Sequence, residues 1–355
     1  MLTPPPEDKT ASPTSSNPHQ PHNGSPSFDV VSTYNNILST DPFITKPVAA
    51  IESLICLLSA SPPSTISETL SLLESATSEL KGSVPNSIAL SAGTDLFQRY
   101  LISTLQQGSA QYAKSKGRRS SSNGDGDFKA IRAHLLANSR LFVQRAKESR
   151  GQIATVARRF VRDGCTVLTC GRSRVVAAVL SAAAENGANF RVVYAQDFYN
   201  APSNSSMDIV TELRRKDIPV AAIPFAALAT SLPHIEFALV GAESVVENGG
   251  IISGMGTNQM GLLAKSAGKP FYVVAESHKF VRIYPLSGDD LPLGQKVLDF
   301  KTEGGEEEKE HEEGKRKAGG EAVDFTPPDL ITALVTESGV QTPSAVSEEL
   351  IKIWY

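Results

Sequence analysis

Cysteine, long apolar runs and an excess of charge of one sign are all scarce in this sequence of 355 residues. The three cysteines, Cys56, Cys165 and Cys170, are too few and too scattered for a disulfide framework or a zinc site, which fits a reducing compartment. No apolar run approaches the ~18 to 20 residues that cross a bilayer, and the proline-rich start lacks the apolar core of a signal peptide, so we expect a cytoplasmic protein without a membrane partner. A formal net charge of −4 and the lack of a basic stripe with interleaved aromatic residues argue against direct nucleic-acid binding.

Three segments have too few apolar residues to pack into a core. Residues 1–27 hold seven prolines and only three apolar side chains, so we expect a disordered tail. Residues 115–127, SKGRRSSSNGDGD, have the composition of a flexible loop, either a plain linker or a segment for phosphorylation or partner contact. We expect an acidic insertion at residues 301–322, where residues 303–317 carry seven acids and four bases.

Helical periodicity dominates the first half of the chain. From Phe28 to about Gly164, apolar residues recur at three-and-four spacings without a convincing alternating run, which predicts a helix bundle. Thr65 and Glu68 fit a capping box before one of these helices. The periodic segment at 128–162 exceeds the usual ~8 to 20 residues of a globular helix, so it is either one long helix or two helices broken near Gly151.

After Gly164 the pattern changes to short apolar runs at 165–170, 190–195, 218–223, 237–242 and 270–275. Alternation of such runs with helical stretches indicates a parallel sheet covered by helices on both faces. A last helix is expected from Thr342 onward. The predicted fold class is therefore α/β, with a helical bundle over 28–163 and a doubly wound parallel-sheet domain over 164–355.

Ligands bind beyond the carboxyl ends of the strands in such a sheet, so the segments after the predicted strands are the places to look for a site. After the first strand, TCGRSRVVAAVL (169–180) gives Gly171, Arg172, Ser173 and Arg174 ahead of a helix. A helix start and two arginines would stabilise a phosphate. A capped helix with exposed arginines explains the pattern equally well, because the spacing matches no standard phosphate-binding motif.

A second loop, GAESVVENGGIISGMGT (241–257), follows the fourth strand. Glu243 and Asn248 supply polar groups, Gly249 and Gly250 allow close backbone approach, and Thr257 can cap the next helix. The two loops together predict a pocket for an anion with hydroxyl groups.

The sequence offers little for catalysis or metal binding. Glu243 is the only good acid in the predicted pocket and Cys170 the only thiol nearby, and local sequence fixes no histidine or lysine beside either. A lone loop glutamate is more often a cap or surface residue. The six histidines, including His234 and His278 near predicted strand ends, have no metal-ligand spacing. We therefore predict no catalytic residue, no metal and no cofactor.

Four strings carry a resemblance to a known family: SRVV (173–176), VGAESVVENGGII (240–252), KPFYVVAESHKFVRIYPL (269–286) and TPSAVSEELIK (342–352). They resemble the alpha, or regulatory, subunits of eukaryotic translation initiation factor 2B, over about residues 28–355. The resemblance implies a helical domain followed by a Rossmann-like domain, and a homodimer that joins the beta, gamma, delta and epsilon subunits into a decameric guanine-nucleotide exchange factor. It also implies that the helical domain senses the phosphorylated alpha chain of translation initiation factor 2. The cavity is implied to accept a sugar phosphate or nucleoside monophosphate.

The same fold is shared with isomerases of methylthioribose 1-phosphate or ribose 1,5-bisphosphate, which supply the second hypothesis. Their LTHCNAG resembles LTCGRSR (168–174), which puts their catalytic cysteine at Gly171. Their GADR and NGD correspond to GAES (241–244) and NGG (248–250), and the lysine of their NKIGT corresponds to Gly254. These departures favour a non-catalytic regulatory subunit over an isomerase that uses Glu243 and Cys170.

Overall fold

The computed structural model describes residues 28–41, 44–61, 65–84, 86–115, 124–196, 207–291 and 322–354. The expected tail at 1–27 and nearly all of the expected acidic insertion at 301–322 lie outside these residues. The centre of the expected loop at 115–127 does so as well, but Ser115 ends helix α4 and residues 124–127 already belong to helix α5. That loop prediction was therefore too long at both ends.

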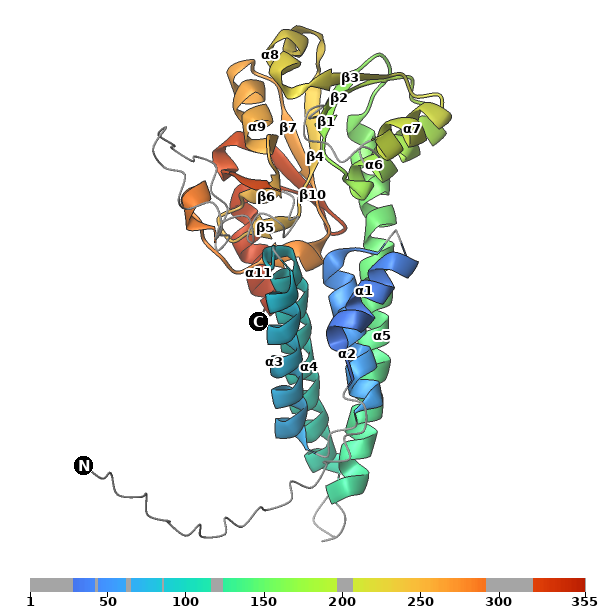
Figure 1. Cartoon of the computed structure of the whole chain (residues 1–355), viewed down its shortest axis with the longest axis vertical. Coiled ribbons are helices and arrows are strands. Elements are labelled where there is room, and N and C mark those ends of the chain that lie inside the picture. The colour runs from blue at the N-terminus through green and yellow to red at the C-terminus, as the bar shows by residue number, and fades with distance from the viewer. Residues whose placement is uncertain are drawn as a thin grey trace, which may run out of the picture.

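Five α-helices lie in the described residues up to Ala157, and they form the long lower part of the molecule in Figure 1. Their bounds are α1 (Val30–Thr40), α2 (Lys46–Ala60), α3 (Ile66–Ser83), α4 (Ile88–Ser115) and α5 (Gly124–Ala157). The expected cap of α3 is confirmed, because the Thr65 side chain accepts a hydrogen bond of 3.1 Å from the Glu68 N–H. The bundle core is formed by apolar side chains at helical spacing. Among them are Ile51, Leu54 and Leu58 of α2, Leu73 and Leu80 of α3, and Leu90, Phe97 and Leu101 of α4. The predicted bundle is confirmed.

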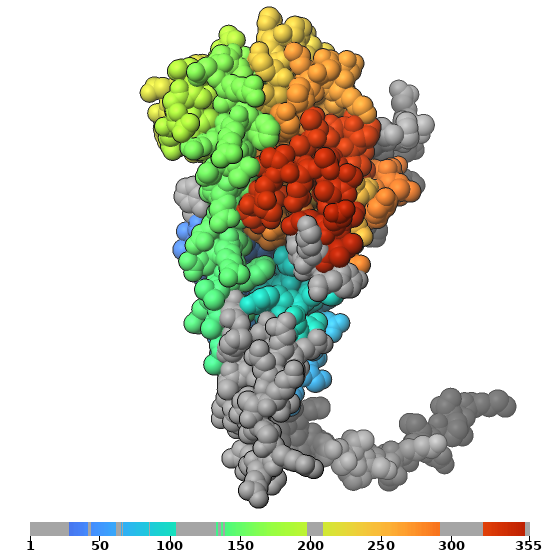
Figure 2. Space-filling model, turned by 180° about the vertical axis from the view of Figure 1, so that it is seen from behind, coloured from blue at the N-terminus to red at the C-terminus, as the bar shows by residue number. Residues whose placement is uncertain are grey.

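Helix α5 is continuous over 34 residues, which settles the choice between one helix and two in favour of one. Its middle packs on α2, with Val143 in the bundle core. Its last turns pack on α6 and β10, with Ile153, Ala154 and Ala157 in a core of the sheet domain. Figure 2 shows α5 as a green column that passes beside the red C-terminal segment. One helix therefore belongs to both halves of the molecule.

The main sheet has seven strands in the order β11-β10-β7-β4-β1-β2-β3. All five strands expected from the sequence are present, as β1 (Thr166–Cys170), β2 (Arg191–Gln196), β3 (Val220–Pro224), β4 (Phe237–Gly241) and β7 (Phe271–Val274). They pair in parallel, as does β10 (Ala333–Thr336), while β11 (Gly339–Gln341) is antiparallel at the edge. Counted along the chain, the parallel strands have the order 3-2-1-4-5-6 of a Rossmann-type sheet. The predicted fold class is confirmed.

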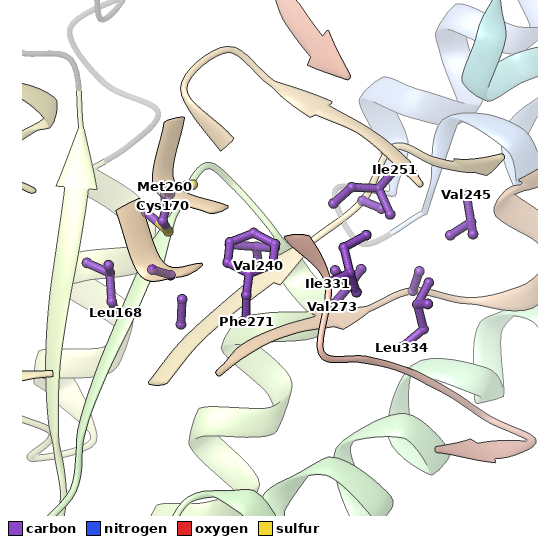
Figure 3. Packing of buried hydrophobic residues seen from close by; sticks show 14 of the residues in the cluster. Leu168, Cys170, Val240, Val245, Ile251, Met260, Phe271, Val273, Ile331 and Leu334 are labelled. Carbon is purple, nitrogen blue, oxygen red and sulfur yellow. The ribbon is translucent and has the colours of Figure 1, made fainter. Parts of the chain in front are cut away.

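Both faces of this sheet are buried by helices. On one face, α6 (Arg174–Glu185), α7 (Met207–Arg215) and the end of α5 cover Val167, Val192 and Leu239. On the other face, α8 (Leu228–Ser231), α9 (Thr257–Ser266) and α11 (Val346–Trp354) cover a core that includes Leu168, Val240 and Val273. In Figure 3, Cys170 and Met260 lie beside each other in this core, with Phe271 and Val240 next to them.

A second sheet of four short strands was not expected from the sequence. Its order is β8 (Phe280–Val281), β5 (Ser244–Val246), β6 (Ile251–Gly254) and β9 (Val323–Thr326). The predicted loop at 241–257 is therefore wrong over most of its length, because β5 and β6 form an antiparallel hairpin there. Short 3-10 helices complete the described fold: Arg158–Phe160, Phe225–Ala227, Leu232–His234, Ser277–Lys279, Gly288–Asp290, Pro328–Leu330 and Pro343–Ala345.

Candidate functional site

The point where the strand order reverses lies between β1 and β4, the two central strands. In an open sheet of this kind, ligands bind outside the carboxyl ends of the strands at this point. The segments that flank it are Gly171–Ser173 after β1 and Ala242–Glu243 after β4. Both segments were expected to form the site from the sequence.

The loop after β1 ends at the start of helix α6. Gly171 has a φ of +69°, and its carbonyl accepts a hydrogen bond of 2.8 Å from the Tyr194 hydroxyl. Ser173 caps α6 by accepting a bond of 3.3 Å from the Val176 N–H. Arg172 is exposed beside this helix start. Because the start of a helix carries a partial positive charge, this loop has the electrostatics of an anion site.

Gly241 lets the two loops meet. A Cβ built on Gly241 would collide with the side chain of Ser173, so any larger residue would push the end of β4 away from the start of α6. The absence of a side chain is therefore required by close approach at this position.

Arg174 is turned toward the helical bundle. Its Nη1 donates a hydrogen bond of 2.5 Å to the carbonyl of Ile44, which precedes α2. Burial lowers the pKa of Arg174, and the nearby positive charges of Arg150 and Arg172 act in the same direction. The predicted phosphate-binding arginine thus also joins the two halves of the chain.

Glu243 contacts the bundle too. Its Oε2 accepts a hydrogen bond of 3.0 Å from the Asn86 side-chain amide, just before α4. The carbonyl of Ala242 accepts a bond of 3.0 Å from Nζ of Lys279. The Asn86 amide does not titrate, so its contact gives the Glu243 carboxylate no partner for proton transfer.

The start of α9 brings Thr257 and Cys170 together. The Thr257 hydroxyl donates a bond of 2.7 Å to the carbonyl of Gly254 and lies 3.8 Å from Sγ of Cys170. Burial raises the pKa of the Cys170 thiol to about 12. The thiol is therefore protonated at neutral pH, and a protonated thiol is a poor nucleophile.

Asp324 of β9 belongs to the same place and was missed in the sequence. Its Oδ2 accepts hydrogen bonds of 2.7 Å from the Gly256 N–H and 3.0 Å from the Asn258 N–H. Burial raises the pKa of Asp324 to about 6, although these N–H groups favour the charged form. Asp324 fills the anion-binding position at the start of α9, so a ligand phosphate would have to compete with it there.

Asn248, Gly249 and Gly250 form the turn of the β5–β6 hairpin. Asn248 donates to the carbonyl of Pro285 (2.7 Å) and accepts from the Gly250 N–H (2.9 Å). A Cβ on Gly249, whose φ is +86°, would collide with the carbonyl of Pro343. Glu243 lies at the opposite end of this hairpin, where its N–H bonds the carbonyl of Ile252. The hairpin thus separates these three residues from Glu243 and from the loop after β1.

A buried ionic group lies beyond the carboxyl end of β7. Glu276 is 1% exposed, and its carboxylate lies 2.8 Å from Nζ of Lys279 and 3.9 Å from Nε of Arg150. Burial opposes ionisation of Glu276, but Lys279 and the neighbouring His278 outweigh it and lower its pKa to about 2. Nε2 of His278 lies 3.2 Å from the hydroxyl of Thr45, and burial lowers the pKa of His278 to about 4. His278 is thus buried and neutral at neutral pH.

Other kinds of site find no support in the part of the chain that the structure describes. It contains no group of three or more His, Cys, Asp and Glu residues that could hold a metal ion. None of its helices has the length and apolar character of a membrane span. A hollow of about 370 Å³ lies at the amino ends of β7 and β10, at the opposite edge of the sheet from Glu243, lined by Lys265, Gly268, Lys269, Pro270, Asp329, Leu330, Ile331 and Thr332. We place the candidate site at the switch point because the helix starts and polar groups gather there.

Comparisons with known proteins agree with the fold. The chain is 32% identical to the translation initiation factor eIF2B subunit alpha of Dictyostelium discoideum over 332 residues, which cover 92% of this chain and 97% of that protein. It is 28% identical over 214 residues to the ribose 1,5-bisphosphate isomerase of Archaeoglobus fulgidus, covering 60% and 65% of the two chains.

Among solved structures, a chain of the eIF2B-beta2-delta2 complex from C. thermophilum superimposes with a TM-score of 0.68 at 17% identity, covering 92% of this chain and 95% of that one. The model of the initiation factor 2 subunit family matches residues 40–343, which include helices α2 to α5, the main sheet and the switch point. This chain therefore belongs to the initiation factor 2 subunit family, and it is similar over nearly its whole length to an eIF2B alpha subunit.

Proposed function

We propose that this chain is a non-catalytic regulatory subunit of the guanine-nucleotide exchange factor for translation initiation factor 2. The similarity to an eIF2B alpha subunit over 92% of the chain carries the proposal. In the cytoplasm the chain forms a homodimer that bridges two copies of the beta, gamma, delta and epsilon subunits into a decamer. Exchange then becomes sensitive to the phosphorylated alpha chain of factor 2, which makes the chain part of the integrated stress response.

The two halves of the chain divide this work. The helical domain, residues 28–163, faces the phosphorylated alpha chain of factor 2. The Rossmann-like domain, residues 164–355, makes the homodimer contact. The chemistry at the switch point supports a regulatory function, because Gly171 offers no nucleophile and the buried Cys170 thiol is protonated at neutral pH.

The deciding experiment is the rate of GDP release from factor 2, catalysed by the other four subunits, with and without this chain. Phosphorylated factor 2 is titrated into both reactions. Adding the chain should raise exchange and make it sensitive to the phosphorylated form. If neither the rate nor the sensitivity changes, the chain is not the regulatory subunit.

The pocket at the switch point is proposed to hold a sugar phosphate or a nucleoside monophosphate. Arg172 and Arg174 with the start of α6 would bind the phosphate, with Gly171 and Ser173 shaping the loop, and Glu243 and Thr257 would face the sugar. In this proposal Asn248, Gly249 and Gly250 hold the shape of the hairpin behind the pocket. Replacing Arg172 or Arg174 should weaken phosphate binding measured by calorimetry. Unchanged affinity in both single variants would reject this placement of the ligand.

The second candidate is a sugar-phosphate isomerase, which the similarity to the archaeal ribose 1,5-bisphosphate isomerase favours. Such an enzyme would depend on Glu243 as acid and Cys170 as nucleophile. The test is turnover of ribose 1,5-bisphosphate and of methylthioribose 1-phosphate by the wild-type chain and by Glu243→Ala. Turnover that Glu243→Ala abolishes would support the enzyme with Glu243 as its acid. Turnover retained in the variant would reject that role of Glu243, and no turnover by the wild-type chain would reject the enzyme.

A further inference from the structure

Asparagine followed by glycine is a pair of residues prone to lose the asparagine side-chain amide, because glycine has no side chain to hinder attack by its backbone nitrogen. Four such pairs occur in the sequence, and two of them, Asn186–Gly187 and Asn248–Gly249, lie wholly within the described residues. The two pairs share their chemistry and differ in their surroundings, so each serves as the reference for the other.

The first pair ends helix α6 at the surface. Asn186 is the C-cap residue and is exposed, and its side-chain amide has no hydrogen-bond partner among the described residues. Gly187 is exposed as well, has a φ of +89°, and has open space where a Cβ would lie. Backbone bonds hold this turn, among them the 2.9 Å bond from the Gly187 N–H to the Ala184 carbonyl. Because helix ends fray, the turn opens without disturbing the core.

The second pair is held in the turn of the β5–β6 hairpin. Both ends of the Asn248 side chain are bonded, one to the Pro285 carbonyl at 2.7 Å and the other by the Gly250 N–H at 2.9 Å. Gly249 is buried, and it lies so close to Pro343 that a Cβ would collide with the proline backbone. The Asn248 side chain can turn toward the Gly249 nitrogen only after both of its hydrogen bonds are broken.

We propose that Asn186 is a site of spontaneous deamidation in the folded chain and that Asn248 is protected from the same reaction. When the turn opens, the backbone nitrogen of Gly187 attacks Cγ of Asn186 and gives up its proton. The bond from Cγ to the side-chain nitrogen breaks, that nitrogen takes up a proton and leaves as ammonia, and a cyclic imide remains. Water then opens the imide at either carbonyl, which leaves aspartate or isoaspartate at this position. One water is consumed and one ammonia is released, with no oxidant or reductant.

The product differs from the original chain in charge. It carries one more negative charge, at the end of α6, where the last carbonyls of the helix already carry a partial negative charge. The modified and unmodified chains therefore separate by ion exchange, which gives a readout that needs no partner and no activity.

Incubation of the full folded chain at pH 8 and 37 °C tests the inference. The deamidated fraction at each position is followed by proteolysis and mass spectrometry, with fragment spectra that distinguish Asn186 from the nearby Asn189. Breaking each of the two side-chain bonds of Asn248 lowers the population of the released side chain by a factor of about two to ten. We therefore expect Asn186 to deamidate at least about ten times faster than Asn248.

Two controls separate the fold from the local sequence. In guanidinium chloride both pairs lack their native contacts, so Asn186 and Asn248 should deamidate at similar rates. In the variant Asn186→Gln the attack would have to close a larger ring, which is much slower. This variant should therefore lose the more acidic form that accumulates at position 186, with no change in the rate at Asn248.

Each result decides the proposal. If Asn186 is unchanged in the folded chain over a time in which the denatured chain reacts, the exposed site is overturned. Equal rates at Asn186 and Asn248 in the folded chain would overturn the protection of Asn248. If the two rates already differ tenfold in guanidinium chloride, the local sequence sets the difference and the structural argument fails. None of these outcomes depends on the regulatory function, which GDP release decides separately.

Discussion

His278 makes the stability of this protein depend on pH in a way that one substitution can isolate. Its imidazole is 3% exposed and bonded to Thr45, and burial lowers its pKa from the ordinary 6.5 to about 4. Between these two values the unfolded chain binds a proton that the folded chain does not. Stability contributed by neutral His278 is therefore present above pH 6.5 and is lost as the pH falls toward 4.

The size of the effect follows from the two pKa values. At pH 5 the expected loss is RT ln[(1 + 10^(6.5−5))/(1 + 10^(4−5))], or about 2 kcal/mol relative to high pH. Asp324 acts in the opposite direction, because its pKa is raised from 3.8 to about 6 and the folded chain gains a proton first. Between pH 7 and 5 Asp324 adds about 1.3 kcal/mol of stability. The wild-type chain alone would hide most of the histidine effect.

The substitution His278→Gln isolates the contribution of His278 to the pH dependence of stability, because glutamine keeps a polar group near Thr45 and does not titrate. We expect the free energy of unfolding by urea at 25 °C, wild type minus His278→Gln, to fall by about 2 kcal/mol from pH 7 to pH 5. His234→Gln is the control for the loss of a histidine at an exposed position. A wild-type minus His278→Gln difference that stays constant within about 0.5 kcal/mol would refute the buried neutral histidine, since one pKa unit corresponds to about 1.4 kcal/mol.

Three further changes have expected outcomes. Asp324→Asn removes a group that stabilises the folded chain as the pH falls. The free energy of unfolding of this variant, relative to wild type, should therefore fall by about 1.3 kcal/mol from pH 7 to pH 5. A difference that does not change with pH would contradict the raised pKa of Asp324. Gly249→Ala should cost about 2 to 4 kcal/mol from left-handed strain and collision with Pro343, whereas Gly164→Ala, with a similar φ and open space, should cost about 1 to 2, as measured by urea unfolding; equal costs would rule out the collision. A thiol reagent at pH 8 should label exposed Cys56 in the native chain but reach Cys170 only in denaturant, and rapid native labelling of Cys170 would disprove its burial.

The main sheet could be predicted because its strands are short, nearly continuous apolar runs in the sequence. This holds for the buried strands β1, β4 and β7 and also for the edge strand β3, whose residues are half-buried or exposed. The second sheet has no comparable apolar runs in the sequence. Its strands have two to four residues, and β5 and β6 lie in a stretch whose glycines and polar residues are typical of a loop.

The candidate site was predictable only in part, because its contacts join distant segments. The partner of Arg174 is a backbone carbonyl 130 residues away, and that of Glu243 is Asn86, 157 residues away. Asp324 caps the start of α9 from 66 positions along the chain, on the other side of the acidic insertion. Local patterns identify a helix start or a turn, but they do not show which distant group is paired with it. Contacts to Pro285 and Pro343 likewise explain the turn of the hairpin better than a ligand does.

Helix α5 is long enough to turn a small rotation at one end into a large movement at the other. At 1.5 Å per residue, its 34 residues extend about 50 Å. Its last turns are anchored in the sheet domain by Ile153, Ala154 and Ala157, so this end of the helix is held in place by the sheet domain. A rotation of about 5° there would move the other end by about 4 Å, on the order of one side chain's width. Small angular changes at this anchored end would thus become large displacements at the far end of the helix.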